Sequence, residues 1–377
     1  MSADAPVDVL HLGAAALPLY RAADPGHLRL DLAAAPAGTG ALALLTALRH
    51  GTEVRCDRGT ATLYAPDLPL PPVTGSRRLS AGHTNTLDIV DERYAVKWYA
   101  EPALGTTREQ QLLTRLTRAD CRVTPAAAGA LTWHADGPPT TLAVVTAYLP
   151  GTTDGWTLLE HLDPLHAEDE LRALCRSFGT VLAELHTALA PLPRGRLGSA
   201  TRLARITARI AAARAACRGD LPVPELPLFT ADLTAQDVHG DVHLGQFLVA
   251  DGRVHMADLE GDPTERPHER SRPDTPLRDL ASLRRSVLLA HLWRRAEHGD
   301  PPAARAGYDR ALADLTDAYA VASGGLPAGW TAWLPLLELE KAAGEVLYAR
   351  RFLPEWLPTA RASYADAAAS LEPEPHR

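Results

Sequence analysis

Residues 239–263, HGDVHLGQFLVADGRVHMADLEGDP, contain the side-chain types that bind metal–phosphate complexes. Asp241, Gln246 and Asp258 supply two carboxylates and one carboxamide. Oxygen ligands of this kind suit Mg²⁺, which uses few carboxylates together with phosphate oxygens. Zn²⁺ would instead require a closed set of histidine and cysteine ligands. The stretch therefore predicts a Mg²⁺ site, provided that the fold brings the three side chains together.

An Asp-Gly pair in the middle of this stretch indicates the element that would bring them together. Asp-Gly between apolar runs is the strongest short-range signal for a β-hairpin, so we expect a hairpin over 247–256. A two-residue loop at the Asp-Gly pair puts Gln246 opposite Ala257, one residue from Asp258. The hairpin would thus join Gln246 and Asp258 at its open end, with Asp241 on a polar loop just upstream.

The spacing of His239, Asp241 and Gln246 matches that of a phosphoryl-transfer loop. Protein kinases use His-x-Asp-x₄-Asn, in which the aspartate orients the acceptor hydroxyl and the asparagine holds a metal ion; here glutamine replaces asparagine. Isolated histidines and aspartates in loops are usually solvated or capping groups, but the loop, the hairpin and the following aspartate together favour phosphoryl transfer. We take Asp241 as the candidate catalytic residue, with His243 beside it as a second candidate.

A site for the phosphates of ATP is expected around Lys97. The chain has only two lysines, Lys97 and Lys341, against 36 arginines, so a lysine that remains indicates a need for a compact ammonium. Strand alternation puts Lys97 on the face opposite Val96 and Trp98, from which it could reach the α- and β-phosphates. The alternative is an ordinary solvated lysine on a strand.

Two further groups near this strand are candidates for ATP binding. Glu109 could form an ion pair with the strand lysine, as the helix glutamate does in protein kinases, or it could close a capping box with Thr106. Thr84, Asn85 and Thr86 precede the strand pair where a glycine-rich loop would lie, and could contact phosphate through hydroxyl and backbone N–H groups.

The acceptor site is expected on a helix over 337–352. Glu338, Lys341, Glu345 and Tyr348 recur at spacings of three and four, so they share one face of this helix. A polar face on a late helix is commonly just solvated. A carboxylate and an aromatic edge are also the groups that a sugar site uses, and both interpretations stay open.

The apolar pattern divides the chain into three predicted parts, a cap domain over 1–70, an ATP-binding small lobe with a mixed β-sheet over 71–150 and a mostly helical lobe over 151–377. The first boundary follows from the proline-rich linker APDLPLPPVTGS, because proline fixes φ and removes a donor. The third part would carry the catalytic loop, the metal site and the sugar site.

The elements follow from hydrophobic periodicity and turn residues. Helices are expected over 41–48, 106–117, 171–189, 203–216, 276–297, 301–322 and 331–351. Strands are expected over 52–54, 60–64, 87–90, 94–99 and 142–149, besides the hairpin.

Composition excludes several classes of protein. The 377 residues carry a net charge of −8, which argues against the basic footprint of a nucleic-acid binder. The four cysteines form no CxxC pair, which argues against a zinc ribbon or a disulfide framework. No apolar stretch reaches the roughly 20 residues needed to span a bilayer, and Asp4 and Asp8 near the start are unlike a signal peptide. We expect a cytoplasmic protein that acts on small molecules, without nucleic-acid or membrane partners.

Several motifs resemble the maltokinase group within the aminoglycoside phosphotransferase-like kinases, over roughly 80–360. They are AYLPGTTDGW, AELHTALA, HGDVHLGQ, ADLEGDP, TPLRDLASLRRS and LELEKAAGEVLYARR. The resemblance implies an α+β, bilobal protein-kinase-like (aminoglycoside phosphotransferase-like) fold with a small N-terminal cap domain. It implies that Asp241 is the catalytic base, that Gln246 and Asp258 hold Mg²⁺ with Glu260 assisting, and that Lys97 holds the ATP phosphates.

Two departures from maltokinases point to a neighbouring branch. The cap is shorter than expected of a maltokinase, and Leu259 replaces the phenylalanine of that family's DFE motif. The chain is more similar to the glucosamine kinase branch, whose members phosphorylate the 6-hydroxyl of glucosamine with ATP. Maltokinase and antibiotic phosphotransferase activities are the alternatives, and a kinase-like binding module without catalysis is the non-enzymatic one.

A glucosamine acceptor would require a carboxylate for its ammonium group. A charge-assisted hydrogen bond of this kind contributes about 1.5–3 kcal/mol. Glu345 is the first candidate for this role because it shares a helix face with Tyr348, and Glu338 is the second.

Overall fold

The computed structural model describes residues 5–24, 26–65, 70–81, 85–163, 165–190, 195–226, 232–299, 301 and 303–371. The chain divides into two compact units, Met1–Thr152 and Thr153–Arg377. The predicted boundary between 150 and 151 lies two residues from this division.

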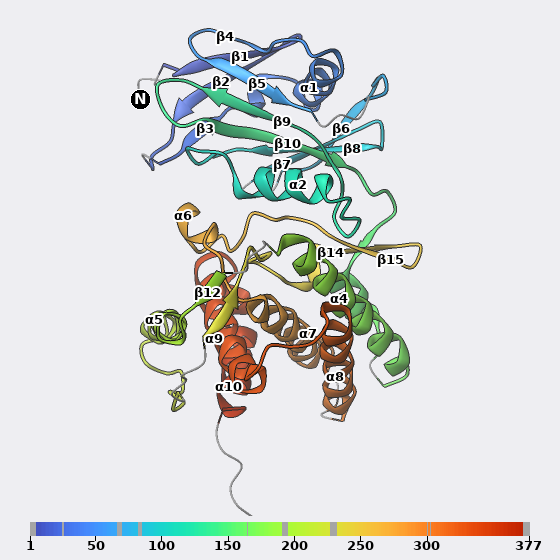
Figure 1. The fold of residues 1–377 in the computed structure, drawn as a ribbon, viewed down its shortest axis with the longest axis vertical. Helices are drawn as coiled ribbons and strands as arrows, with labels where there is room; N and C mark the ends of the chain where they lie inside the picture. The colour runs from blue at the N-terminus through green and yellow to red at the C-terminus, as the bar shows by residue number, and fades with distance from the viewer. Residues whose placement is uncertain are drawn as a thin grey trace, which may run out of the picture. The chain divides into compact units, whose positions relative to one another are not determined.

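Antiparallel strands dominate the first unit (Figure 1). Its elements are β1 (Asp8–Leu12), β2 (Ala15–Arg21), β3 (Leu28–Leu30), η1 (Leu32–Ala34), α1 (Thr39–His50), β4 (Arg55–Cys56), β5 (Thr60–Tyr64), β6 (Ser76–Ala81), β7 (Asn85–Val90), β8 (Tyr94–Tyr99), α2 (Arg108–Arg118), β9 (Ala127–His134) and β10 (Thr140–Ala147). One sheet has the order β3-β2-β1-β4 and the other β5-β9-β10-β8-β7-β6.

The larger sheet differs from the mixed sheet that we predicted. Every pairing described between its strands is antiparallel. Short turns suffice between antiparallel neighbours, whereas a parallel pair needs a long crossover, and the chain between β6 and β8 is too short for one. The predicted strand over 52–54 is also displaced, because β4 begins at Arg55, three residues after the predicted start, and Val54 forms only an isolated bridge to Ala61.

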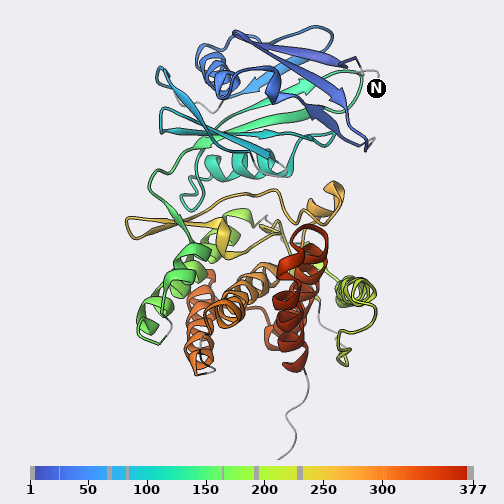
Figure 2. The ribbon, with the colours of Figure 1, turned by 180° about the vertical axis from the view of Figure 1, so that it is seen from behind.

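The predicted cap and small lobe share one core. β5, from the predicted cap, pairs along its whole length with β9. Leu44 on α1 is buried in the same apolar cluster as Trp98 and Val145 of the larger sheet. The close approach of α1 to β9 requires a glycine at position 129. A Cβ at Gly129 would lie only 2.7 Å from Cδ1 of Leu48. The boundary predicted near residue 70 therefore falls inside one compact unit, in which α1 packs against strands of both sheets (Figure 2).

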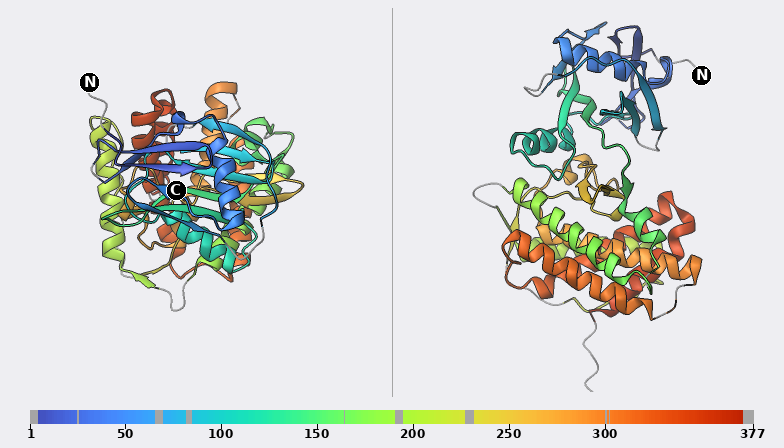
Figure 3. Two further views of the ribbon diagram at one scale, coloured as in Figure 1. Left: turned by 90° about the horizontal axis from the view of Figure 1, so that it is seen from above. Right: turned by 90° about the vertical axis from the view of Figure 1, so that its right-hand side faces the viewer.

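The second unit is mostly helical. Its elements are β11 (Thr153–Asp154), α3 (Gly155–His161), α4 (Glu168–Leu189), β12 (Gly195–Leu197), α5 (Ser199–Ala216), β13 (Leu233–Ala235), η2 (Leu244–Gln246), β14 (Phe247–Ala250), β15 (Arg253–Met256), α6 (Pro267–Arg270), α7 (Pro276–His298), α8 (Ala304–Ser323), α9 (Trp330–Phe352), η3 (Pro354–Trp356) and α10 (Leu357–Ala369). α4 packs along α8, and α9 packs against α5, α7 and α10 (Figure 3, right).

One hairpin within this helical unit positions the candidate metal ligands. β14 pairs with β15 in the predicted register, from Phe247 opposite Met256 to Ala250 opposite Arg253. Asp251 and Gly252 both have positive φ, 49° and 70°, as a tight two-residue hairpin loop requires.

Among the described residues, no helix combines the length and the apolar character needed to cross a bilayer.

Candidate active site

A buried carboxylate, Asp279 near the start of α7, holds the loop that carries Asp241. Its Oδ2 accepts a hydrogen bond from the backbone N–H of His239 at 2.5 Å, and its Oδ1 accepts one from Gly240 at 3.0 Å. Nε2 of His186, on α4, lies 3.0 Å from the same carboxylate. His186 therefore holds the Asp279 carboxylate in place, and this carboxylate fixes the backbone just before Asp241 through two N–H groups.

Asp279 stays ionised across the physiological pH range. Burial alone would raise the pKa of this carboxyl, but the hydrogen bond and charge of His186, together with the Gly240 N–H, lower it to about 2. His186 is itself buried, and its Nδ1 lies 2.8 Å from the hydroxyl of Tyr319. It is a core residue that reaches the catalytic loop through Asp279.

Gln246 and Asp258 meet at the open end of the hairpin. Nε2 of Gln246 lies 3.2 Å from Oδ2 of Asp258 and 3.0 Å from Nε2 of His243. Because an ionised carboxylate only accepts hydrogen bonds, the Gln246 amide nitrogen is the donor in the first contact. Burial lowers the pKa of His243, so its neutral ring can accept the second. The adjacent amide and carboxylate fit Mg²⁺, and Glu260, two residues further on, is partly buried.

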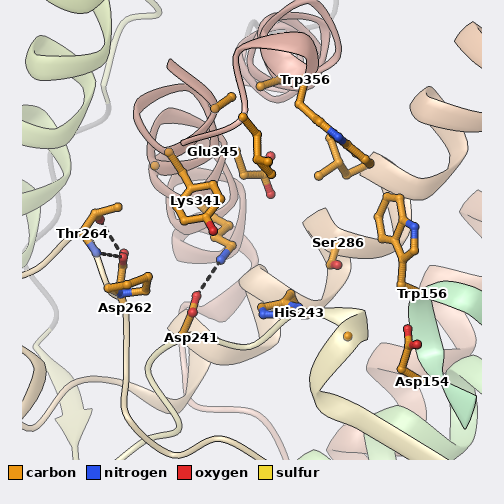
Figure 4. A pocket seen from close by; sticks show the side chains of 18 of the residues that line it. Asp154, Trp156, Asp241, His243, Asp262, Thr264, Ser286, Lys341, Glu345 and Trp356 are labelled. Carbon is orange, nitrogen blue, oxygen red and sulfur yellow. Dashed lines mark hydrogen bonds and ion pairs between the residues drawn. The ribbon is translucent and has the colours of Figure 1, made fainter. Parts of the chain in front are cut away.

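A cavity of about 540 Å³ opens beside Asp241, and its lining residues all belong to the second unit (Figure 4). Its charged lining consists of four carboxylates and two cations, Asp154, Asp241, Asp262, Glu345, Arg209 and Lys341. Its charged side chains therefore sum to two negative charges. A cation is favoured over a neutral ligand in such a cavity.

Lys341 on α9 pairs with the candidate catalytic residue. Its Nζ lies 3.3 Å from Oδ1 of Asp241, and both side chains are about one-fifth exposed. Burial would lower the pKa of Lys341, but the charges of Asp241, Glu345 and Asp262 outweigh burial and raise it. The ammonium is thus charged, and the ion pair orients the Asp241 carboxylate.

The cavity carboxylates Asp262 and Glu345 differ in how fully they are bonded. Asp262 accepts a hydrogen bond from Nη2 of Arg209 at 2.6 Å, and from the N–H and hydroxyl of Thr264 at 2.8 and 2.6 Å. Burial raises the pKa of Asp262, but Arg209 and the other nearby groups lower it to about 2. For Glu345, the contact found within the described ranges is the Ser363 hydroxyl, 2.9 Å from Oε2. Glu345 is therefore the more available carboxylate for a ligand.

The other acceptor-site candidates lie in different surroundings. Tyr348 lines the cavity, and burial together with the charges of Asp241 and Asp262 raises the pKa of its hydroxyl. Glu338 is not among the residues that line the cavity. Its Oε1 accepts a hydrogen bond from Nε of Arg284, and its side chain is buried.

In the first unit, Lys97 on β8 forms an ion pair with Glu109 on α2. The Nζ–Oε2 distance is 3.0 Å, and the hydroxyl of Tyr99 donates to the same oxygen at 2.6 Å. The alternative capping box is absent, because the residue that caps α2 is Thr107 rather than Thr106. Glu109 is buried, so its carboxylate depends on these two contacts rather than on water.

The loop candidates that precede this strand pair are only partly described. Thr84 lies outside the described residues. Asn85 begins β7 opposite Tyr99, and Thr86 is buried opposite Trp98.

Sequence reasoning missed several cavity residues. Arg209 and Asp262 lie 53 positions apart, and no spacing rule connects them. Trp156 and Trp356, for which no motif or spacing indicated a role, both line the cavity. For Lys341 a signal existed, since the scarcity of lysine pointed to it as it did to Lys97.

No family model matches the chain, but individual proteins do. It is 30% identical to a glucosamine kinase of Mycolicibacterium smegmatis over 367 residues, which cover 91% of this chain and 90% of that protein. It is 31% identical to a glucosamine kinase of Streptacidiphilus jiangxiensis over 326 residues, which cover 76% of this chain and 72% of that protein.

Solved structures show the same likeness. A glucosamine kinase in complex with glucosamine, ADP and inorganic phosphate is 25% identical, with a TM-score of 0.74 over 95% of this chain and 92% of that one. A further crystal form of a glucosamine kinase gives 26% identity and a TM-score of 0.73, over 97% of this chain and 91% of that one. The predicted α+β, protein-kinase-like fold class is confirmed. With such similarity over most of its length, the chain belongs to the glucosamine kinase family.

Proposed function

We propose that the protein transfers the γ-phosphoryl group of ATP to the 6-hydroxyl of glucosamine, giving glucosamine 6-phosphate and ADP. The observation that carries this proposal is the cavity beside Asp241, which is acidic and contains the available carboxylate of Glu345. The names of the relatives, and the glucosamine and ADP in the similar solved structure, support the same acceptor and donor.

Asp241 is the proposed catalytic base. It accepts the proton of the acceptor hydroxyl while the new bond forms between that oxygen and the γ-phosphorus and the bond to the bridging oxygen of ADP breaks. Lys341 orients the Asp241 carboxylate through the 3.3 Å ion pair. His243, the second candidate, contacts the amide nitrogen of Gln246 through its Nε2 and so positions that metal-ligand candidate.

Bound with ATP, Mg²⁺ neutralises charge on the phosphates. Gln246 and Asp258 would hold it, with Glu260 assisting. In the first unit, Lys97, oriented by Glu109, would bind ATP phosphates, with Thr84, Asn85 and Thr86 as further candidates. The expected partners are therefore ATP and an amino sugar, in the cytoplasm.

The metal role of Asp258 can be tested by nucleotide binding alone. Asp258→Ala should weaken ADP binding measured by calorimetry in Mg²⁺, and should change it little in EDTA. A loss of the same size in both buffers would show that Asp258 acts on the nucleotide without a metal ion.

Glu345 is proposed to bind the ammonium group of glucosamine. A charge-assisted hydrogen bond contributes about 1.5–3 kcal/mol, which glucose and maltose cannot gain at this carboxylate. Asp262 is already bonded to Arg209 and Thr264, so it serves to maintain the negative field. Glu338 has no part in this proposal, because it contacts Arg284 away from the cavity lining.

An ADP-release assay tests the proposed function. The wild-type protein with MgATP is offered glucosamine, glucose, maltose and kanamycin in parallel. We expect glucosamine to give the highest kcat/KM. Maltose as the best acceptor would support the maltokinase alternative, kanamycin as the best would support an antibiotic phosphotransferase, and no turnover with any of them would support a binding module.

A further inference from the structure

The cavity beside Asp241 is larger than one sugar ring needs, and its far side is aromatic. Its volume of about 540 Å³ lies within the range of roughly 300–1,000 Å³ typical of pockets for drug-sized ligands, which are larger than a single sugar ring. The groups proposed to bind glucosamine lie toward one side in Figure 4, while Trp156 and Trp356 face the cavity from the other. The proposed reaction on free glucosamine leaves this aromatic side unused.

Trp156 and Trp356 form an aromatic wall of the cavity, and a third tryptophan packs against both of them. The rings of Trp156 and Trp356 meet edge to face with centroids 5.3 Å apart. Trp293 on α7 lies 6.0 Å from each, and its plane is within 10° of that of Trp356. Trp156 belongs to α3 and Trp356 to η3, so the wall is formed by residues near the start and near the end of the second unit's sequence. Both line the cavity and are only partly buried, which leaves ring surface available to a ligand.

The proposed orientation of glucosamine directs its anomeric carbon toward this wall. In glucosamine the amine-bearing carbon and the carbon that carries the 6-hydroxymethyl group lie across the ring from each other, and the anomeric carbon is next to the amine. With the 6-hydroxyl at Asp241 and the amine at Glu345, a substituent on the anomeric oxygen leaves the ring on the Glu345 side. Figure 4 places Glu345 between Lys341 and Trp356.

We propose that the preferred acceptor is a glucosaminide, an amino sugar with a second ring on its anomeric oxygen, and that this ring packs against Trp156 and Trp356. This inference rests on the proposed function. Aromatic side chains provide large apolar contact surfaces for rings. Ser286, also in the lining, accepts a hydrogen bond from the Leu244 N–H at 3.0 Å, so its own hydroxyl hydrogen is available to the second ring.

The chemistry is compatible with this acceptor. Transfer to the 6-hydroxyl forms an oxygen–phosphorus bond, breaks the bond to the bridging oxygen of ADP and passes one proton to Asp241. The glycosidic bond takes no part. Methyl and phenyl glucosaminide have no free anomeric hydroxyl, so turnover of these two glycosides also excludes phosphorylation at that position.

The first experiment compares acceptors with the wild-type protein and MgATP. Glucosamine, methyl β-glucosaminide, phenyl β-glucosaminide and the disaccharide of two β-1,4-linked glucosamines are assayed for ADP release. Burial of the second ring against the two tryptophans predicts at least about a tenfold higher kcat/KM for the two-ring acceptors than for the methyl glycoside. Calorimetry without ATP should give the same order of affinities.

The second experiment removes the aromatic wall. Trp156→Ala and Trp356→Ala should each lower the ratio of kcat/KM for phenyl glucosaminide to that for glucosamine by about tenfold. Trp356→Phe should keep most of this ratio, which covers the case in which an alanine variant fails to fold. Trp330→Ala, at the start of α9 and outside the cavity lining, is the matched control and should leave the ratio unchanged.

The outcomes separate this inference from the proposed function. If glucosamine is phosphorylated but the two-ring glycosides are not preferred to both glucosamine and the methyl glycoside, the inference is wrong and the function stands. An unchanged ratio in both alanine variants would also overturn it. If neither glucosamine nor any glycoside is phosphorylated, the proposed function itself fails.

Discussion

The two lysines of the chain lie in different units, and each pairs with a carboxylate, but the pairs are built differently. Lys97 and Glu109 stand on a strand and a helix, 3.0 Å apart, with a hydroxyl of Tyr99 on the same glutamate. Lys341 stands on a helix, 3.3 Å from an aspartate on a loop that Asp279 tethers. A chain that uses arginine almost everywhere keeps lysine at both places, which fits a need for a compact ammonium rather than a planar fork.

The two pairs therefore differ in how sensitive their geometry is to substitutions elsewhere in the chain. The first pair depends on two regular elements, so its geometry follows from local structure. The second depends on a loop whose backbone is fixed by a buried carboxylate 40 positions away from His239. Changes to the second site are therefore expected to alter both chemistry and stability.

The largest effect should come from the loop aspartate itself. Asp241→Asn removes the proton acceptor but keeps the size of the side chain, so kcat for glucosamine should fall by about 10²–10⁴-fold. ATP binding should be nearly unchanged. Asp309→Asn, at an exposed position on α8, is the control for loss of a carboxylate. A fall of less than tenfold with an unaltered unfolding temperature would remove Asp241 from the role of base.

Substitution of each lysine should impair the use of a different substrate. Lys97→Met should raise the KM for ATP, and Lys341→Met should impair glucosamine turnover without changing nucleotide affinity. Loss of a charge-assisted contact of about 1.5–3 kcal/mol corresponds to roughly 10–100-fold in either case. Steady-state kinetics with each substrate varied in turn measures both effects, with Arg350→Met on the exposed face of α9 as control. If both variants weaken the same substrate, the assignment of one lysine to each site is wrong.

The hydrogen bonds by which Asp279 holds the catalytic loop should contribute to the free energy of unfolding. The pKa of Asp279 in the folded protein is about 2, below its ordinary value of 3.8. Its ionised form thus stabilises the fold above about pH 4, and this contribution is lost as the pH falls toward 2. Asp279→Asn should lower the free energy of unfolding by about 2 kcal/mol at pH 7, as measured in urea.

The pH dependence provides the internal control for this effect. The difference between Asp279→Asn and wild type should shrink as the pH is lowered from 4, because the wild-type carboxylate then becomes protonated too. A difference that stays constant down to the acid transition would mean that the asparagine acts through packing rather than charge.

A smaller effect is expected at the proposed ammonium site. Glu345→Gln should raise the KM for glucosamine by about tenfold and narrow its advantage over glucose, because one charge-assisted hydrogen bond becomes neutral. Glu338→Gln, on the same helix but outside the cavity, should leave that advantage intact. If glucose and glucosamine turnover fall equally in Glu345→Gln, this carboxylate binds hydroxyl groups instead.

Local rules were sufficient where neighbouring residues decide the geometry. The Asp-Gly loop determines the register of β14 and β15, and with it the contact between Gln246 and Asp258. Strand alternation likewise put Lys97 on the face from which it reaches Glu109.

Local rules failed where distant segments meet. β1 and β2 are short, with Pro18 inside β2, and their partner strands and the core that they share with the larger sheet cannot be read from nearby residues. The sequence left open whether the face of α9 that carries Lys341 is exposed to solvent or forms a binding site. The burial of this face depends on α5, the catalytic loop and the segment after β15, which are distant in sequence. The tryptophan wall is the extreme case, because Trp156 and Trp356 lie 200 positions apart.

The central claim is that this chain phosphorylates the 6-hydroxyl of glucosamine. The most direct measurement is the reaction of the wild-type protein with MgATP and equal concentrations of glucosamine, glucose and maltose, with the products resolved by ³¹P and ¹³C nuclear magnetic resonance. We predict glucosamine 6-phosphate as the main product, formed in proportion to the ADP released. Maltose phosphorylated at its anomeric carbon as the main product, or ADP released without any phosphorylated sugar, would contradict the account.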